Sequence, residues 1–167
     1  MSSDALVILR NDHKEMRKLF RAFEKAGDDA TEQKAELVRT IIGELTAHTY
    51  IENECLYPAT RQLLPDLEDD ILESYEEHHV ADLLCAELFA MEPTAERFDA
   101  KTTVLIEVVE HHMEEEEQEW FPKVRDGLGR KQLTEIGQRM LAMKETAPRS
   151  PEDPKARKSA ADAAGAA

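Results

Sequence analysis

One pattern of eleven residues occurs twice in this chain, 64 residues apart, and it limits the fold more than any other feature. The two copies are HTYIENECLYP at residues 48–58 and HMEEEEQEWFP at residues 112–122. Each begins with His, has Glu four residues later, and ends in two large apolar residues and Pro. On an α-helix, residues four apart differ by only about 40° and lie about 6 Å apart along the axis. Each His–Glu pair can therefore bind one metal ion from a single helix face, and the two pairs predict a metal site shared by two helices.

The composition favours an all-α protein of one domain. The chain has 167 residues, which is enough to bury a core, and it is 34% charged and only 5% aromatic. Only 6 Gly and 7 Pro interrupt it. This profile is typical of helical rather than sheet-rich proteins.

The formal net charge of −15 disfavours nucleic acid and anionic membranes as main partners and favours cations. No apolar run reaches the roughly 20 residues of a membrane span, and the N-terminal residues lack a basic leader followed by an apolar stretch. Cys55 and Cys85 are too few for a disulfide framework. We therefore expect a cytoplasmic protein, and the sequence leaves its oligomeric state open.

Apolar residues at spacings of three and four predict four long helices, at about residues 4–26, 31–57, 67–91 and 95–121. A shorter fifth helix is predicted at about residues 130–144, packed across the bundle. Pro58 is expected to kink or end the second helix. Residues 146–167 are rich in Pro, Ala and charge without an apolar period, so they are predicted to be a disordered tail after a domain at residues 1–145.

Polar groups interrupt the apolar face of every long helix. Each helix has one His there, two of them add a Glu one turn later, and the third adds an Asp. An unpaired buried carboxylate costs several kcal/mol, whereas a whole domain is stable by only about 5–15 kcal/mol. Since no Lys or Arg shares these faces, bound cations with neutral His ligands are predicted. The interrupting residues are His13, His48, Glu52, His78, Asp82, His112 and Glu116.

Without Asp82, these residues supply six ligands, which are too many for one structural zinc ion and suit two metal ions. Imidazole with carboxylate fits iron, with manganese or zinc as alternatives. Asp82 is either a seventh ligand or an acceptor for a His N–H, and Tyr57 either supplies a phenolate or packs in the bundle. The acidic run at residues 114–119 is predicted to face solvent except for Glu116.

The order of these motifs resembles the haemerythrin-like (HHE cation-binding) family over about residues 4–126. The resemblance lies in a His in the first helix, His-x-x-x-Glu before Tyr-Pro, Glu-His in the third helix, and His-x-x-x-Glu before Phe-Pro. It implies an up-down-up-down four-helix bundle holding two non-haem iron ions in an Fe–O/OH–Fe centre. The ligands that the resemblance implies are His13, His48, Glu52, His78, His112 and Glu116.

The chain departs from the oxygen-carrying members in two places. Ser74 stands four residues before His78, where they have a further His, and the last carboxylate follows His112 by four residues and not by five. We expect these changes to turn the function from oxygen storage towards reaction with small oxidants such as oxygen, hydrogen peroxide or nitric oxide, including catalase-like decomposition of peroxide. The alternatives are an iron-sensing or iron-storage module without turnover and a metal-free helical interaction bundle.

Overall fold

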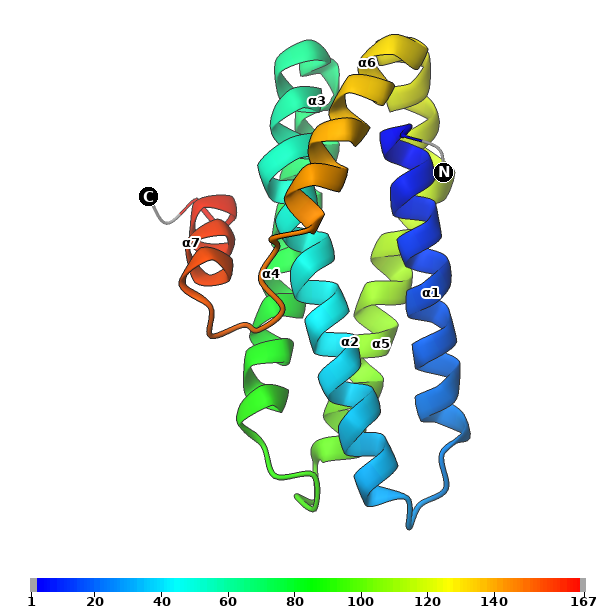
Figure 1. Cartoon of the computed structure of the whole chain (residues 1–167), viewed down its shortest axis with the longest axis vertical. Coiled ribbons are helices and arrows are strands. Elements are labelled where there is room, and N and C mark those ends of the chain that lie inside the picture. The colour runs from blue at the N-terminus through cyan, green and yellow to red at the C-terminus, as the bar shows by residue number, and fades with distance from the viewer. Residues whose placement is uncertain (1–2, 166–167) are drawn as a thin grey trace.

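Four long antiparallel helices form the body of the protein, as the sequence predicts (Figure 1). The computed structural model describes residues 3–165. The long helices are α1 (Ala5–Lys25), α2 (Thr31–Ile51), α4 (Glu68–Ala90) and α5 (Phe98–Glu115). The α1–α2 and α4–α5 connections lie at one end of the bundle, and α3 (Tyr57–Leu63) and the first part of α6 (Phe121–Lys144) lie at the other (Figure 1). This up-down-up-down arrangement confirms the predicted fold class.

The apolar core has two parts, and on α1, α2 and α4 a His lies between them. One part is built around Leu9, Ile51 and Tyr57, and the other around Phe20, Leu45 and other residues nearer the α1–α2 connection. Along α1, for example, His13 comes after Leu9 of the first part and before Phe20 of the second. The titratable side chains therefore form a polar layer enclosed by apolar packing on both sides.

Both copies of the repeated motif contain a π-helical turn that begins at the motif Glu. These turns are η1 (Glu52–Leu56) and η3 (Glu116–Trp120), and they continue into α3 (Tyr57–Leu63) and α6 (Phe121–Lys144). The N–H of the residue after each turn donates to the carbonyl of the motif Glu, five residues back. In a regular helix a Pro ring clashes with the carbonyl four residues back, and the wider turn before each Pro relieves this clash. The helical path therefore continues past Pro58 and does not end there.

The helix α6 contains a break that separates residues 121–128 from residues 130–144. Gly129 has φ 69° and ψ 175°, a conformation that glycine adopts without steric cost. The second segment places Leu133, Ile136 and Met140 in the core against the start of α1. It corresponds to the predicted fifth helix. A short 3-10 turn, η2 (Pro65–Leu67), joins α3 to α4.

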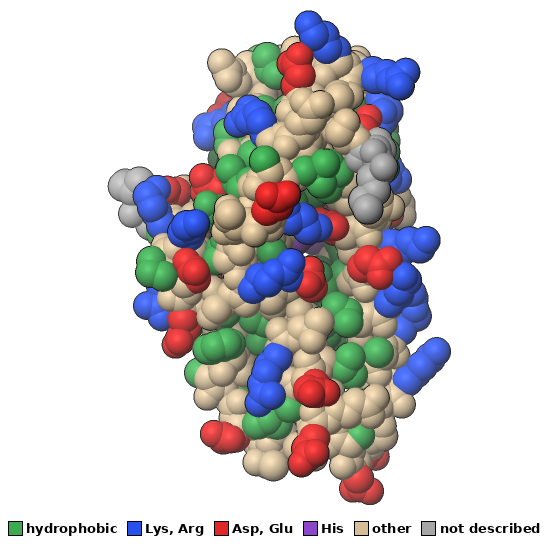
Figure 2. All heavy atoms as spheres, viewed as in Figure 1, with side chains coloured by type: hydrophobic (Ala, Val, Ile, Leu, Met, Phe, Trp, Pro, Cys, Tyr) green, Lys and Arg blue, Asp and Glu red, His purple; other side chains and the backbone are tan. Residues whose placement is uncertain are grey.

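The surface has acidic and basic side chains side by side, as the face in Figure 2 shows. Several pairs join distant parts of the chain, such as Arg125 with the N-cap residue Asp4 at 3.1 Å, and Arg149 with Glu44.

Among the described residues, no helix is both long enough and apolar enough to cross a membrane.

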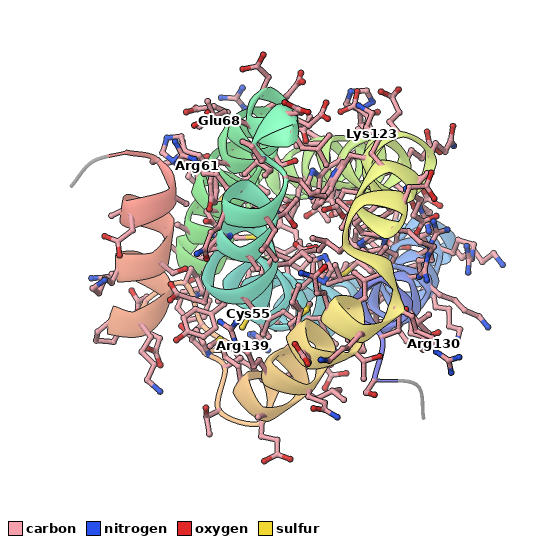
Figure 3. All side chains as sticks on the ribbon, turned by 90° about the horizontal axis from the view of Figure 1, so that it is seen from above. Cys55, Arg61, Glu68, Lys123, Arg130 and Arg139 are labelled. Carbon is pink, nitrogen blue, oxygen red and sulfur yellow. The ribbon has the colours of Figure 1, made fainter. Side chains whose placement is uncertain are left out.

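The segment predicted to be a disordered tail contains a further helix, α7 (Pro154–Ala163). It lies outside the ring of long helices and contacts α2 and α4 (Figure 3). Pro154 in its first turn and the Asp153 side chain, which accepts a hydrogen bond from the Lys155 N–H, start the helix. The face of α7 that turns towards the bundle consists of Ser159 and alanines. The sequence therefore has no periodic pattern of large apolar residues here that would predict a helix. Residues 166 and 167 of the predicted tail lie outside the described part of the chain.

We predict that Gly137→Ala destabilises the protein by about 1–3 kcal/mol, because overpacking forces neighbouring atoms apart. A Cβ at Gly137 would lie 1.9 Å from the carbonyl oxygen of Ser3 and 2.7 Å from the backbone nitrogen of Ala5, where α6 crosses the start of α1. Thermal unfolding followed by circular dichroism measures the effect. The control is Gly27→Ala, since a Cβ there meets nothing within 4 Å. Equal melting temperatures of the two variants would show that α6 does not approach the start of α1 this closely at Gly137.

Candidate metal centre

The structure brings all six predicted ligand residues into one buried layer. His13, His48, Glu52 and Glu116 place one ligand atom each within 4.8 Å of one another, and Glu52, His78 and His112 form a second such group. Glu52 belongs to both groups, so the two groups adjoin. Both glutamates have no exposed surface, and the four histidines are at most 5% exposed.

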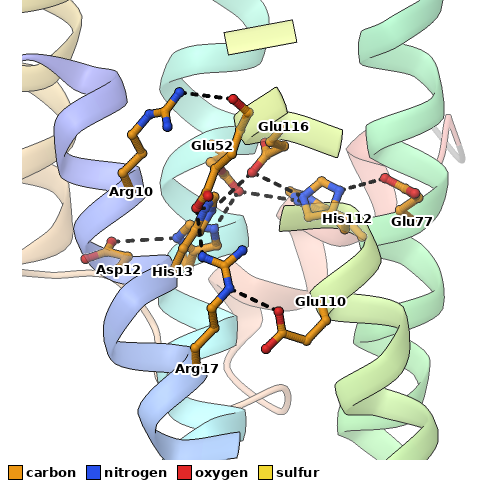
Figure 4. A network of polar contacts seen from close by, with 12 residues as sticks. Arg10, Asp12, His13, Arg17, Glu52, Glu77, Glu110, His112 and Glu116 are labelled. Atoms are coloured by element: carbon orange, nitrogen blue, oxygen red, sulfur yellow. Dashed lines mark hydrogen bonds and ion pairs between the residues drawn. The ribbon is translucent and has the colours of Figure 1, made fainter. Parts of the chain in front are cut away.

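Each glutamate lies between two imidazoles, one from its own helix and one from the other half of the bundle (Figure 4). Glu52 Oε2 is 3.2 Å from His48 Nε2 and 3.4 Å from His78 Nε2. Glu116 Oε2 is 3.1 Å from His13 Nε2 and 3.6 Å from His112 Nε2. Every imidazole therefore turns its Nε2 atom inward, and both carboxylates stand where they can bridge two ions.

The outward Nδ1 atoms of two histidines face the carboxylate that directly precedes another ligand. Glu77, which precedes His78, has Oε2 at 2.6 Å from His112 Nδ1. Asp12, which precedes His13, has Oδ2 at 3.6 Å from His48 Nδ1, beyond hydrogen-bond length. Such contacts orient an imidazole and raise its basicity as a ligand.

The other two histidines face the residue that directly follows a motif glutamate. His78 Nδ1 lies 2.9 Å from Asn53 Oδ1, and His13 Nδ1 lies 2.8 Å from Glu117 Oε1. Glu117 is only 22% exposed and also accepts a hydrogen bond from Arg17 at 2.9 Å. The prediction that Glu117 faces solvent is therefore wrong, because its side chain reaches across to α1.

Sequence reasoning missed Asp12, Asn53, Glu77 and Glu117 as supports of the ligands. Each is a direct neighbour of a predicted ligand and so lies about 100° away from it around the helix. Helical periodicity assigns such a residue to a different face, and only the position of the next helix decides what that face meets. Adjacency to a ligand was the one available signal.

Tyr57 is the main difference between the two halves of the centre. Its hydroxyl donates to Glu116 Oε1 at 3.0 Å and lies 3.2 Å from His78 Nε2. The matching residue of the second motif is Phe121, whose ring stacks on His13 with the centroids 5.9 Å apart. Burial, together with the charge of Glu116, raises the pKa of Tyr57 well above its ordinary value, so its phenol keeps its proton.

Asp82, the other residue predicted as an additional ligand, belongs to neither group of converging atoms. It lines a separate cavity between the bundle and α7. Asp82 follows His78 by one helical turn. Its side chain lines the cavity between α2, α4 and α7 and not the space where the ligand atoms converge.

The geometry of the donor atoms fits metal ions. Without a metal, six inward or buried ligand atoms have no hydrogen-bond partner among the described residues: His13 Nε2, both ring nitrogens of His48, both carboxylate oxygens of Glu52, and Glu116 Oε2. A buried polar group left without a partner costs about 1–3 kcal/mol. Cations at the two groups would satisfy the Nε2 and carboxylate atoms among them, whereas His48 Nδ1 faces outward to Asp12.

The buried groups of the centre shift one another's pKa values in opposite directions. Burial and the neighbouring Glu116 raise the pKa of Glu52 to about 7. Burial also opposes ionisation of Glu116, but the attraction of His112 and His13 outweighs it and holds that pKa at about 2. Burial and repulsion by His112 lower the pKa of His78 to about 3, which leaves its imidazole neutral, as a metal ligand must be.

A narrow pocket of about 40 Å³ connects the centre with the surface between α4 and α5. It is lined by five carboxylate residues of the surface and reaches Glu116 and His112. A water molecule needs about 10–15 Å³ of such volume, so the pocket has room for only a few small molecules. Glu77, His111 and Glu115 converge beside it in a third, solvent-facing group.

Fold and site together define a four-helix-bundle protein with an interior histidine–carboxylate metal centre. Residues 4–124 match the family described as the Hemerythrin HHE cation binding domain, and the chain belongs to this family. A solved relative is a Hemerythrin HHE cation binding domain-containing protein of Mycobacterium kansasii, with a TM-score of 0.73, 23% identity and 86% of each chain covered. At that identity the likeness shows the fold alone.

A relative known by sequence is a protein named DNA nickase from Nostoc sp. (strain PCC 7120 / SAG 25.82 / UTEX 2576). It is 29% identical over 137 residues, which is 82% of this chain but only 38% of the relative. The chain thus spans little more than a third of that protein.

We predict that Glu116→Gln greatly reduces metal content while the helices stay intact. The amide keeps the shape of the side chain but removes the negative charge that lies between His13 and His112. Elemental analysis and far-UV circular dichroism measure the two quantities. Glu114→Gln, an exposed change of the same charge on the same helix, serves as the control. Equal metal content in both variants would exclude Glu116 as a ligand.

Removal of metal with a chelator is expected to lower the melting temperature markedly, because the buried carboxylates then lose their counter-ions. A metal that exceeds its Kd a thousandfold stabilises the folded state by about 4 kcal/mol. Differential scanning calorimetry of the loaded and stripped protein tests this. Identical melting temperatures would show that the bundle does not depend on a cation.

Proposed function

We propose that this protein binds two non-haem iron ions and reacts with small oxidants, with decomposition of hydrogen peroxide as its activity. One ion would be held by His13, His48, Glu52 and Glu116, and the other by His78, His112 and Glu52, so Glu52 would be shared. A pair of redox-active iron ions supplies the electrons that peroxide chemistry requires. The side chains of the bundle bind the ions, exclude bulk water and supply a proton.

The observation that carries this proposal is the ligand count at each position. Two imidazoles with a carboxylate form the set that leaves coordination positions open on non-haem iron and is typical of iron sites that react with oxygen. Both groups of converging atoms contain such a set. A structural metal site would have all its positions filled by protein atoms.

The size of the access route limits the reaction partner. The pocket that reaches Glu116 and His112 measures about 40 Å³, so oxygen, nitric oxide or peroxide fits and a large organic substrate does not. Its carboxylate lining also suits the passage of cations to the centre.

Tyr57 is the residue we assign to proton transfer. Its protonated hydroxyl lies at hydrogen-bond distance from both Glu116 and His78, so it stands at the centre itself. A general acid placed in this way accelerates a reaction by about 10²–10⁴. The opposite half of the centre has Phe121 at this place and offers no such proton.

Iron storage or sensing without turnover is the second candidate, because the same ligand set and acidic pocket would serve it. DNA as a partner, which the name of the Nostoc relative suggests, is disfavoured by the net charge of −15, since DNA-binding surfaces must neutralise phosphates. The face in Figure 2 has both signs of charge interspersed and not a basic patch.

We predict that the iron-loaded protein releases oxygen from hydrogen peroxide catalytically, as measured with an oxygen electrode. His112→Ala and Glu52→Ala should lose both iron and activity, because each removes an inward ligand. Tyr57→Phe should retain two iron ions per chain but react about a hundredfold more slowly, because the proton donor is lost.

Tyr75→Phe is the matched control, since the Tyr75 ring packs edge-on against Tyr57 with centroids 5.2 Å apart, but its hydroxyl makes no contact with the centre that the structure records. Its rate should equal that of the natural protein. Full iron loading with no oxygen release would favour the storage alternative. Full activity of Tyr57→Phe would remove Tyr57 from the reaction.

A further inference from the structure

A cavity of about 560 Å³ lies between α7 and the bundle, apart from the converging ligand atoms of the metal centre. Its walls come from α2, α4 and α7 and include Tyr50, Leu83, Ala86 and Ala160. Small-molecule sites measure about 300–1,000 Å³ and are mainly apolar with a few polar groups. The size and lining of this cavity meet both criteria.

Asp82 is the polar group that distinguishes this cavity. It is half-buried, and among the described residues no hydrogen bond or ion pair reaches its carboxylate. Burial is the only cause that shifts its pKa, which rises to about 7. An isolated carboxylate in an apolar wall weakens the fold unless something pairs with it. The protein therefore places a carboxyl group in this cavity that none of its described residues pairs with.

The other charged groups that line the cavity do not balance Asp82. Arg157 of α7 lies 3.9 Å from Glu152 and pairs with it. His79 also lines the cavity, as a half-buried ring without a contact to Asp82 that the structure records. The cavity thus has one acidic charge in excess of its basic residues.

Ser159 supplies a second polar group without a partner on the opposite wall. Its side chain is 4% exposed, and its Oγ has no hydrogen-bond partner among the described residues. A buried hydroxyl without a hydrogen-bond partner destabilises the fold, and a bound ligand that paired with it would remove this penalty. Asp82 on α4 and Ser159 on α7 therefore face the same space from two sides.

We propose that this cavity is a binding site for a small organic cation, a primary or secondary ammonium group attached to an apolar body. The ammonium group would donate a charge-assisted hydrogen bond to Asp82, and the apolar body would pack against Leu83 and the alanines of α7. Asn53 lines the same cavity and contacts His78, so the ligand lies one side chain away from the metal centre. The site does not depend on the proposed reaction with oxidants.

Isothermal titration calorimetry on the full-length, metal-loaded protein tests the proposal with three probes of one shape. Phenethylamine is the cation, phenethyl alcohol the neutral analogue and phenylacetate the anion. Phenethylamine should bind at least about tenfold more tightly than the other two, because a charge-assisted hydrogen bond to a sheltered carboxylate is about twice as strong as a neutral one.

Two variants of the cavity and one control complete the experiment. Asp82→Asn should weaken phenethylamine binding about tenfold and leave the melting temperature unchanged or higher, since it removes an uncompensated buried carboxylate. Ala160→Phe fills the cavity from α7 and should abolish binding. Asp69→Asn makes the same charge change at an exposed position of α4 and should bind as the natural protein does.

Failure of all three probes to bind the natural protein would overturn the proposal. Equal affinity for phenethylamine and phenylacetate would overturn it too, as would unchanged binding in Asp82→Asn. Loss of peroxide turnover in any of these proteins has no bearing on this site, so the two proposals fail independently.

Discussion

The burial of Glu52 and Glu116 at mid-height in the bundle is the constraint on which the rest of the structure depends. Both carboxylates are fully removed from solvent, and each lies between two imidazoles from different halves of the chain. Apolar packing above and below seals the layer. Two such charges are tolerable only with counter-ions, so protons or metal ions are part of the fold itself. Stability and metal binding in this protein are therefore two aspects of one interaction.

The two halves of the bundle repeat the same arrangement with one chemical difference. In each half a π-helical turn starts at the motif glutamate, and an aromatic residue follows and packs on a ligand histidine. The aromatic residue is Tyr57 in one half and Phe121 in the other. Only the tyrosine can offer a proton, so the two groups of converging ligand atoms differ in their surroundings.

The helix α7 gives the bundle a second interior space. Because its inner face is made of small residues, it covers α2 and α4 without filling the gap between them, and a cavity remains. Asp82 lies in that cavity instead of at the metal centre, although it follows His78 by one turn. Two residues one turn apart on α4 thus face different spaces, and Asn53 lines the cavity and contacts His78.

The sequence by itself determined the four-helix class, the six converging ligand residues and the helical segment after Gly129. Each of these depends on the periodicity within one helix or on the motif that occurs once on each of two helices. Only the tertiary structure decided the roles of Asp12, Asn53, Glu77, Glu117 and Asp82. Each of these residues stands beside a ligand or one turn after it, and what it meets depends on how neighbouring helices are placed and rotated. The helix at residues 154–163 also depends on the tertiary structure, because its small residues are buried only by packing against the surface of α2 and α4. A periodic pattern states which side of a helix is buried, but it does not state what lies opposite.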